Sequence, residues 1–174
     1  AADALLHVMQ THGLKLDDLA QVVTHVHQGA IDVLGPVVRP VTVHQSKFSM
    51  GTVLALVAQH GHAGLTEFDR DFLSQATQAL RDKVSMVLDA EVDSAYPKRW
   101  IGKVTVTTTD GRVLHGRVDE PKGDPGNTLS RQEITDKALR LAAFSGGATP
   151  EAMRQSVDAL WQVASWPTVG PLLP

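Results

Sequence analysis

The sequence predicts an α+β fold: a small, largely antiparallel sheet with helices packed on one face, followed by a C-terminal helical tail. Three observations lead to this prediction. Strand-like runs are few, and they do not alternate regularly with helices as in a doubly wound fold. The clearest pair of strands meets across Asp110-Gly111, and Asp-Gly supplies the positive φ values that tight antiparallel hairpins need. Several longer segments carry apolar residues at the spacing of amphipathic helices.

The size and composition of the chain exclude several classes of function. Its 174 residues are enough to bury a sizeable core, and 43% hydrophobic and 20% charged residues are typical of a globular domain. The net charge of -3 provides no basic surface for nucleic acid, and no apolar run reaches the roughly 20 residues that cross a bilayer. The absence of cysteine excludes disulfides and thiolate chemistry. We therefore expect a cytoplasmic protein that binds neither nucleic acid nor a membrane.

The first third of the chain predicts a helix, a strand and a second helix. Residues 3–12 have helical spacing, and Gly13 is suited to end that helix. Residues 22–27 form a run rich in β-branched side chains, which is typical of a strand. Residues 46–60 are apolar on almost all sides, so we expect a helix that is buried on most of its surface. The chain begins without Met and inside a helical pattern, which predicts that it is part of a longer protein.

The sequence of the middle of the chain predicts further helical and strand segments, followed by the hairpin. Residues 68–83 have the pattern of one broken or two short amphipathic helices, and residues 84–88 that of a strand. The hairpin strands are expected over 100–108 and 112–118.

The last third predicts a loop and two helices. Residues 123–127 form a Gly- and Pro-rich segment that excludes helix. Ser130 and Glu133 have the spacing of a capping box, so a helix should begin there. A final helix is expected over 150–164, with Pro150 in its first turn.

Two histidines are the first candidates for chemistry. His25 and His27 lie two residues apart in the expected strand, which would place both imidazoles on one face. Such a pair suits a transition metal, although no third ligand at a typical spacing is evident. One of the two could instead face an active-site cleft as acid, base or hydrogen-bond donor, and the pair could also simply face solvent.

The segment from Val43 to Met50 is the second candidate, because it combines polar groups with the start of a buried helix. Helix N-termini attract carboxylates through free amides and the helix dipole, and Lys47 would add a positive charge. The alternative is that Ser46 is only an N-cap and Lys47 a solvated side chain. Ser49 has no evident base, so the pattern does not support a nucleophilic triad.

Three stretches, in this order, resemble the C-terminal part of the MmgE/PrpD family, the group around 2-methylcitrate dehydratase. They are residues 40–50, which run into a helix ending near Gly61, residues 104–111 of the hairpin, and residues 121–130 with the helix that follows. Thr128 stands where the family usually has Pro.

The resemblance implies an enzyme with a large helical domain and a smaller α+β lid, and an active site between them. Its members dehydrate, decarboxylate or epimerise small polycarboxylates, so the parent enzyme would be a lyase or isomerase that requires no organic cofactor and no metal. Residues 1–145 would be the lid, and residues 146–174 a helix and tail that pack on the helical domain. We also expect a homo-oligomer.

The resemblance further implies that the main catalytic residues lie upstream of Ala1, so that the chain alone is inactive. Within the chain it points to His27, Lys47 and Ser49 as substrate-binding residues. Two other functions remain open at this point: a stand-alone module that binds small acids or acts as a scaffold, and a metal-dependent enzyme that uses His25 and His27. We also expect the apolar face of the last helix to become buried, either because the chain self-associates or because that helix folds back on the chain.

Overall fold

The computed structural model describes residues 1–168, which form two compact units. The first unit comprises Ala1–Asn127, and the second begins at Thr128. The predicted fold class is confirmed: helices pack on a four-stranded, mostly antiparallel sheet, and two helices follow at the C-terminal end. The division into a lid at 1–145 and a tail at 146–174 stays a prediction, because it concerns packing on a separate helical domain.

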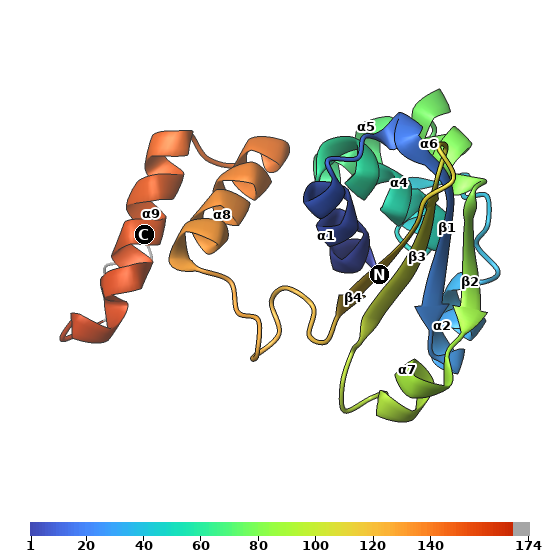
Figure 1. The fold of residues 1–174 in the computed structure, drawn as a ribbon. Coiled ribbons are helices and arrows are strands. Elements are labelled where there is room, and N and C mark those ends of the chain that lie inside the picture. Colours follow the sequence, from blue (N-terminus) through green and yellow to red (C-terminus); the bar gives the residue numbers. More distant parts are fainter. Residues whose placement is uncertain (169–174) are drawn as a thin grey trace. The chain divides into compact units, whose positions relative to one another are not determined.

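The sheet has the strand order β2-β1-β3-β4 (Figure 1). Its strands are β1 (Leu19–Val26), β2 (Val84–Leu88), β3 (Gly102–Thr108) and β4 (Val113–Val118). β1 pairs with β2 in parallel and with β3 in antiparallel orientation, and β3 and β4 form the predicted hairpin. Gly111 in the hairpin turn has a φ of 88°, the positive value that the Asp-Gly pair indicates.

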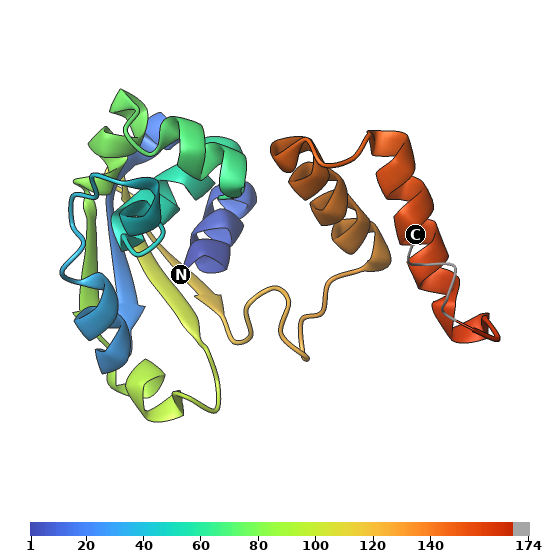
Figure 2. The ribbon, with the colours of Figure 1, turned by 180° about the vertical axis from the view of Figure 1, so that it is seen from behind.

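Helices cover one face of this sheet. The helices of the first unit are α1 (Ala2–His12), α2 (Gln28–Leu34), α3 (Val43–Ser46), α4 (Met50–His60), α5 (Leu65–Asp71), α6 (Gln75–Arg81) and α7 (Ala90–Ala95), with a short 3-10 turn at Leu16–Asp18. Of these, α7 is joined by hydrogen bonds to side chains on the other face. α1 lies against β3 and β4, and α4 lies against β2, α1 and α6. The view from behind in Figure 2 shows α1 and α4 in front of the strands.

The core lies between α1, α4 and the sheet. Alternate residues of β1 and β3 point into it, as the strict alternation of buried and partly exposed positions along β3 shows. Its buried members are Ala4, Leu5, Val8, Met9, Leu14, Leu19, Val22, Leu54, Ala55, Leu80, Val104 and Val106. α4 is buried on most sides, as its composition predicts.

Several local predictions are confirmed. Gly13 ends α1 in the left-handed conformation, with a φ of 63°. Residues 68–83 contain parts of two short helices, α5 and α6, and β2 spans the expected residues 84–88.

The prediction of one helix over 46–60 is wrong, because the helical conformation is interrupted at residues 47–49, between Ser46 and Met50. Ser49 has extended backbone angles and its side chain accepts a hydrogen bond from the amide of Thr52, so Ser49 rather than Ser46 caps the buried helix. Ser46 instead ends α3 and donates a hydrogen bond to the carbonyl of Val43 over 2.7 Å.

The predicted strand at 22–27 also needs correction. β1 begins at Leu19 and ends at Val26, and His27 is the N-cap of α2. The prediction missed α2 and α7, which are short and follow directly on strands.

The second unit consists of α8 (Arg131–Ser145), α9 (Pro150–Gln162) and a 3-10 turn at Val163–Ser165. The predicted capping box is present: the Ser130 hydroxyl accepts from the amide of Glu133, whose carboxylate accepts from the amide of Ser130. α8 and α9 pack against each other, and the guanidinium of Arg131 lies 4.8 Å from the centre of the Trp161 ring. Apolar side chains remain exposed on both helices, at Ile134, Leu141, Phe144 and Leu160. Self-association through this surface stays a prediction.

None of the helices within residues 1–168 is long and apolar enough to span a membrane.

The packing of α1 on β4 leads to a prediction at Gly116. A Cβ at this position would lie 2.6 Å from the carbonyl oxygen of Ala4 and from a methyl of Val8, so α1 approaches the strand too closely for any side chain. Gly116→Ala should therefore lower the free energy of unfolding by about 1–3 kcal/mol. Urea denaturation, followed through amide NMR signals of the first unit, measures the change.

Val113→Ala serves as the control, because Val113 lies on the same strand and is exposed. An unchanged urea midpoint for Gly116→Ala would contradict the close approach of α1 to β4.

Candidate functional site

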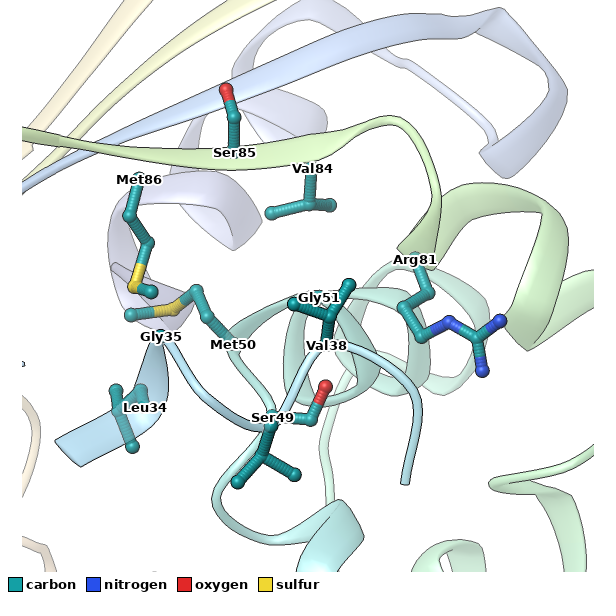
Figure 3. Close-up of a pocket in the computed structure, with 11 residues that line it drawn as sticks. Leu34, Gly35, Val38, Ser49, Met50, Gly51, Arg81, Val84, Ser85 and Met86 are labelled. Carbon is teal, nitrogen blue, oxygen red and sulfur yellow. The ribbon is translucent and has the colours of Figure 1, made fainter. Parts of the chain in front are cut away.

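A pocket of about 160 Å³ lies on the helical side of the sheet, where the end of α2, the start of α4 and the end of α6 meet β2. Figure 3 shows the side chains around it. Its lining consists of Leu34, Gly35, Val37, Val38, Ser49, Met50, Gly51, Arg81, Val84, Ser85 and Met86.

The local sequence explains how α4 reaches this pocket. Ser49 interrupts the helical backbone and caps the new helix, so the first turn of α4 begins at the pocket wall. Gly51 then allows close contact with α6, because a Cβ there would lie 2.8 Å from the carbonyl oxygen and from Cγ of Arg81. A larger residue at position 51 would push the two helices apart.

Ser49 is the polar group of most interest in the lining. Its side chain is buried, and Oγ accepts hydrogen bonds from the amide of Thr52 over 3.4 Å and from the Thr52 hydroxyl over 3.0 Å. The first amides of an α-helix lack intrahelical partners, and the helix dipole adds partial positive charge there. Ser49 therefore brings a buried hydroxyl and the start of α4 to the wall of the pocket.

Arg81 lines the pocket mainly through its aliphatic carbons. Figure 3 shows the guanidinium directed away from Met50 and Met86. Its Nε donates to Asp82 Oδ1 over 3.0 Å. The side chain is almost fully buried while its charge is already paired, so Arg81 supports the wall rather than offering a free cation to the pocket.

Of the three predicted substrate-binding residues, the structure brings only Ser49 to this pocket. Lys47 is exposed at the end of α3, two residues before Ser49. His27 caps α2, where its Nδ1 accepts from the amide of Ala30 over 3.2 Å. The substrate-binding role of all three stays a prediction.

His27 belongs to a separate aromatic cluster. Its ring stacks on Tyr96 at 3.9 Å between centroids and 7° between planes. Trp100 meets the edge of this pair, 6.0 Å from the His27 ring and 5.0 Å from the Tyr96 ring. The expectation that His25 and His27 share one face of a strand is wrong, because the strand ends between them at Val26.

His25 points instead to the polar face of the sheet. Its Nε2 lies 2.8 Å from Thr105 Oγ1, which in turn lies 3.2 Å from Nδ1 of His115. Its Nδ1 lies 3.8 Å from Asp89 Oδ2, a distance for attraction between charges but not for a hydrogen bond. No group of three or more His, Asp or Glu side chains within residues 1–168 is arranged to hold a metal ion.

A network of charged side chains continues across this polar face. Lys103 donates to Asp89 over 2.6 Å and to Glu91 over 3.1 Å. Arg117 donates to both carboxylate oxygens of Glu91, over 2.9 and 2.7 Å, and to Asp119. Because Asp89 caps α7 and Glu91 lies in its first turn, the network fixes that helix to strands β3 and β4.

The hydrogen bonds in this network shift acid–base equilibria. Arg117, followed by Lys103, lowers the pKa of Glu91 to about 2. Lys103 and the amides of the first turn of α7 lower the pKa of Asp89. This network was not predicted from the sequence, although one signal was present. The outward positions of the predicted hairpin carry Lys103, Thr105, His115 and Arg117.

The model of the family described as MmgE/PrpD C-terminal domain matches residues 1–163, which extends over both units. No curated protein matches the chain.

The network predicts how stability depends on pH. The folded state holds the pKa of Glu91 at about 2, below its ordinary value of 4.5, so the stabilisation should be complete above pH 4.5 and lost as the pH falls toward 2. Glu91→Gln should therefore be less stable than the unmodified chain at pH 7, with a difference that shrinks below pH 4.5. Urea denaturation at a series of pH values tests this.

Asp17→Asn is the matched control, since it removes one exposed carboxylate of the same unit outside the network. A Glu91→Gln difference that stays constant between pH 7 and pH 2 would contradict the role of the Arg117 pair.

Proposed function

We propose, from the premise that this chain belongs to the MmgE/PrpD C-terminal domain family, that it forms the lid side of an active site in an enzyme acting on small polycarboxylates. The observation that carries the proposal is the place of Ser49. It belongs to residues 40–50, one of the three stretches through which the sequence resembles the family, and it lines the pocket at the first turn of α4.

The residues of this segment have complementary roles in the proposed site. The Ser49 hydroxyl donates a hydrogen bond to a substrate oxygen, and the first-turn amides of α4 add partial positive charge. Lys47, exposed two residues earlier, supplies a full positive charge for a carboxylate that remains in water-accessible space. His27, outside this segment and outside the pocket lining, is proposed as a further substrate contact, and its ring is oriented by Tyr96 and by its cap on α2.

The chemistry itself needs groups beyond these. Dehydration, decarboxylation and epimerisation of a polycarboxylate each move a proton next to a carboxylate, and this requires a positioned acid and base. In the proposed enzyme those groups come from the helical domain, which closes against the lid. The lid then orients the substrate and excludes water, and a lid by itself lacks the geometry for catalysis.

The lid role predicts that the 174-residue chain alone does not turn over 2-methylcitrate, cis-aconitate or iminodisuccinate in a direct product assay. An antibody against the chain should detect, in its source cells, a protein far heavier than 18.7 kDa. Turnover by the isolated chain would refute the lid role. A band at 18.7 kDa would favour a stand-alone module that binds small acids.

The proposed site also predicts the effect of changing Lys47 in the complete enzyme. Lys47→Ala should raise KM about tenfold or more and leave kcat nearly unchanged, because it removes one charged contact that ground state and transition state share. Lys47→Arg, which keeps the charge, should retain most of the affinity. Steady-state kinetics on the preferred polycarboxylate measures both.

Lys98→Ala is the control for general charge effects, because Lys98 is also exposed but lies in the segment between α7 and β3. Equal KM values for Lys47→Ala and Lys98→Ala would show that Lys47 does not contribute to substrate binding.

A further inference from the structure

The pocket beside Ser49 is lined mainly by apolar side chains. α2 contributes Leu34, α4 contributes Met50, and β2 contributes Val84 and Met86. The segment after α2 adds two further valines, Val37 and Val38. Hydrocarbon and thioether groups therefore line most of this open space. The hydroxyl of Ser85, a further lining residue, is directed away from it in Figure 3, and the Ser49 hydroxyl lies among the apolar groups.

A carboxylate does not suit this environment. Moving an ionised carboxylate from water into an apolar site costs several kcal/mol unless a cation or several donors compensate. Among the lining residues Arg81 alone carries a formal positive charge, and its guanidinium is paired with Asp82 and directed away from Met50 and Met86 (Figure 3). The pocket therefore favours the hydrocarbon part of a ligand, and Lys47 outside it favours the charged part.

The size of the pocket limits the hydrocarbon group. Its volume of about 160 Å³ is close to that of an enclosed apolar cavity of about 150 Å³ that binds benzene, but this pocket is open to solvent on the side of the exposed Val38. A methyl group would leave most of this space empty, whereas a phenyl or branched butyl group would fill it. Met50 and Met86 have flexible side chains that can adjust to either shape.

The Ser49 hydroxyl sets the direction of such a ligand. Because Oγ accepts from the amide and the hydroxyl of Thr52, its own hydrogen is left to donate. A carbonyl or hydroxyl oxygen next to the hydrocarbon group is the acceptor that this position fits.

We infer that the pocket binds a phenyl- or butyl-sized hydrocarbon substituent of a small acid, while the carboxylates of that acid remain outside near Lys47. The inference rests on the proposed function for the acid, and on the lining of the pocket for the substituent. It makes the preferred substrates of the enzyme substituted polycarboxylates rather than unsubstituted ones.

The test uses the 174-residue chain with three probes: benzene, phenylsuccinate and succinate. Methyl NMR signals of Met50, Met86 and Val84 should shift with benzene and with phenylsuccinate, and remain unchanged with succinate. Phenylsuccinate should bind at least about tenfold more tightly than succinate, which corresponds to about 1.4 kcal/mol. Equal shifts of these signals with succinate, or none with benzene and phenylsuccinate, would overturn the inference.

A pair of neighbouring variants localises the binding. Met86→Trp should fill the pocket and abolish the shifts, whereas Val87→Trp should preserve them because successive side chains of β2 point to opposite faces. Should Met86→Trp fail to fold, Leu34→Ala provides a second variant, since it enlarges the pocket and should strengthen binding of a bulkier probe such as naphthalene. Shifts that persist unchanged in folded Met86→Trp would place the binding elsewhere and refute the inference.

The outcome for benzene is independent of the proposed enzyme activity. The activity is tested by turnover and by the Lys47 variants, so a failure there would leave the benzene and phenylsuccinate shifts in place. Conversely, a pocket without affinity for either probe would leave the lid role untouched and remove only the preference for a substituted acid.

Discussion

The close approach of α1 to the β3–β4 hairpin is the constraint on which the first unit depends. Gly116 permits this approach, because any Cβ there would overlap the backbone of Ala4. Because α1 covers that half of the sheet, the buried residues of α4 pack on the remaining apolar surface, over β1 and β2. The start of α4 then meets β2 and the end of α6, so the pocket is a consequence of how two helices share one sheet face.

The two faces of the sheet consequently have different physical roles. The covered face supplies the hydrophobic stabilisation, and its edge at β2 leaves the small apolar space beside Ser49. The other face carries paired charges: Lys103 and Arg117 hold the carboxylates that fix α7. Since each cation there is engaged by acidic partners, this face is better explained as an anchor for α7 than as a site for an anionic ligand.

Local signals determined which features could be predicted from the sequence. The Asp-Gly turn, Gly13 after α1 and the capping box at Ser130 each act within a few residues, and each is confirmed. The break at Ser49 was missed because serine is compatible with a helix interior and with a cap, and only packing decides between them. α2 and α7 were missed because each is a short helix whose cap, His27 or Asp89, directly follows a strand. The pocket was beyond prediction, since its walls come from segments that only the sheet order brings together.

Ser49 illustrates how a family resemblance and physical structure contribute different information. The resemblance singled out residues 40–50 but said nothing of their surroundings, and the sequence alone suggested a positively charged site for carboxylates at the start of the helix. The structure places these two residues in different environments. Lys47 is exposed to water, where a cation attracts carboxylates at little cost, and Ser49 is buried beside hydrocarbon, where a full charge would be expensive. A ligand that satisfies both positions must itself be divided into a charged part and an apolar part. In the site proposed above, the spacing of two residues between Lys47 and Ser49 would keep those parts of the ligand adjacent, and the local chain path would then select a small amphiphilic acid.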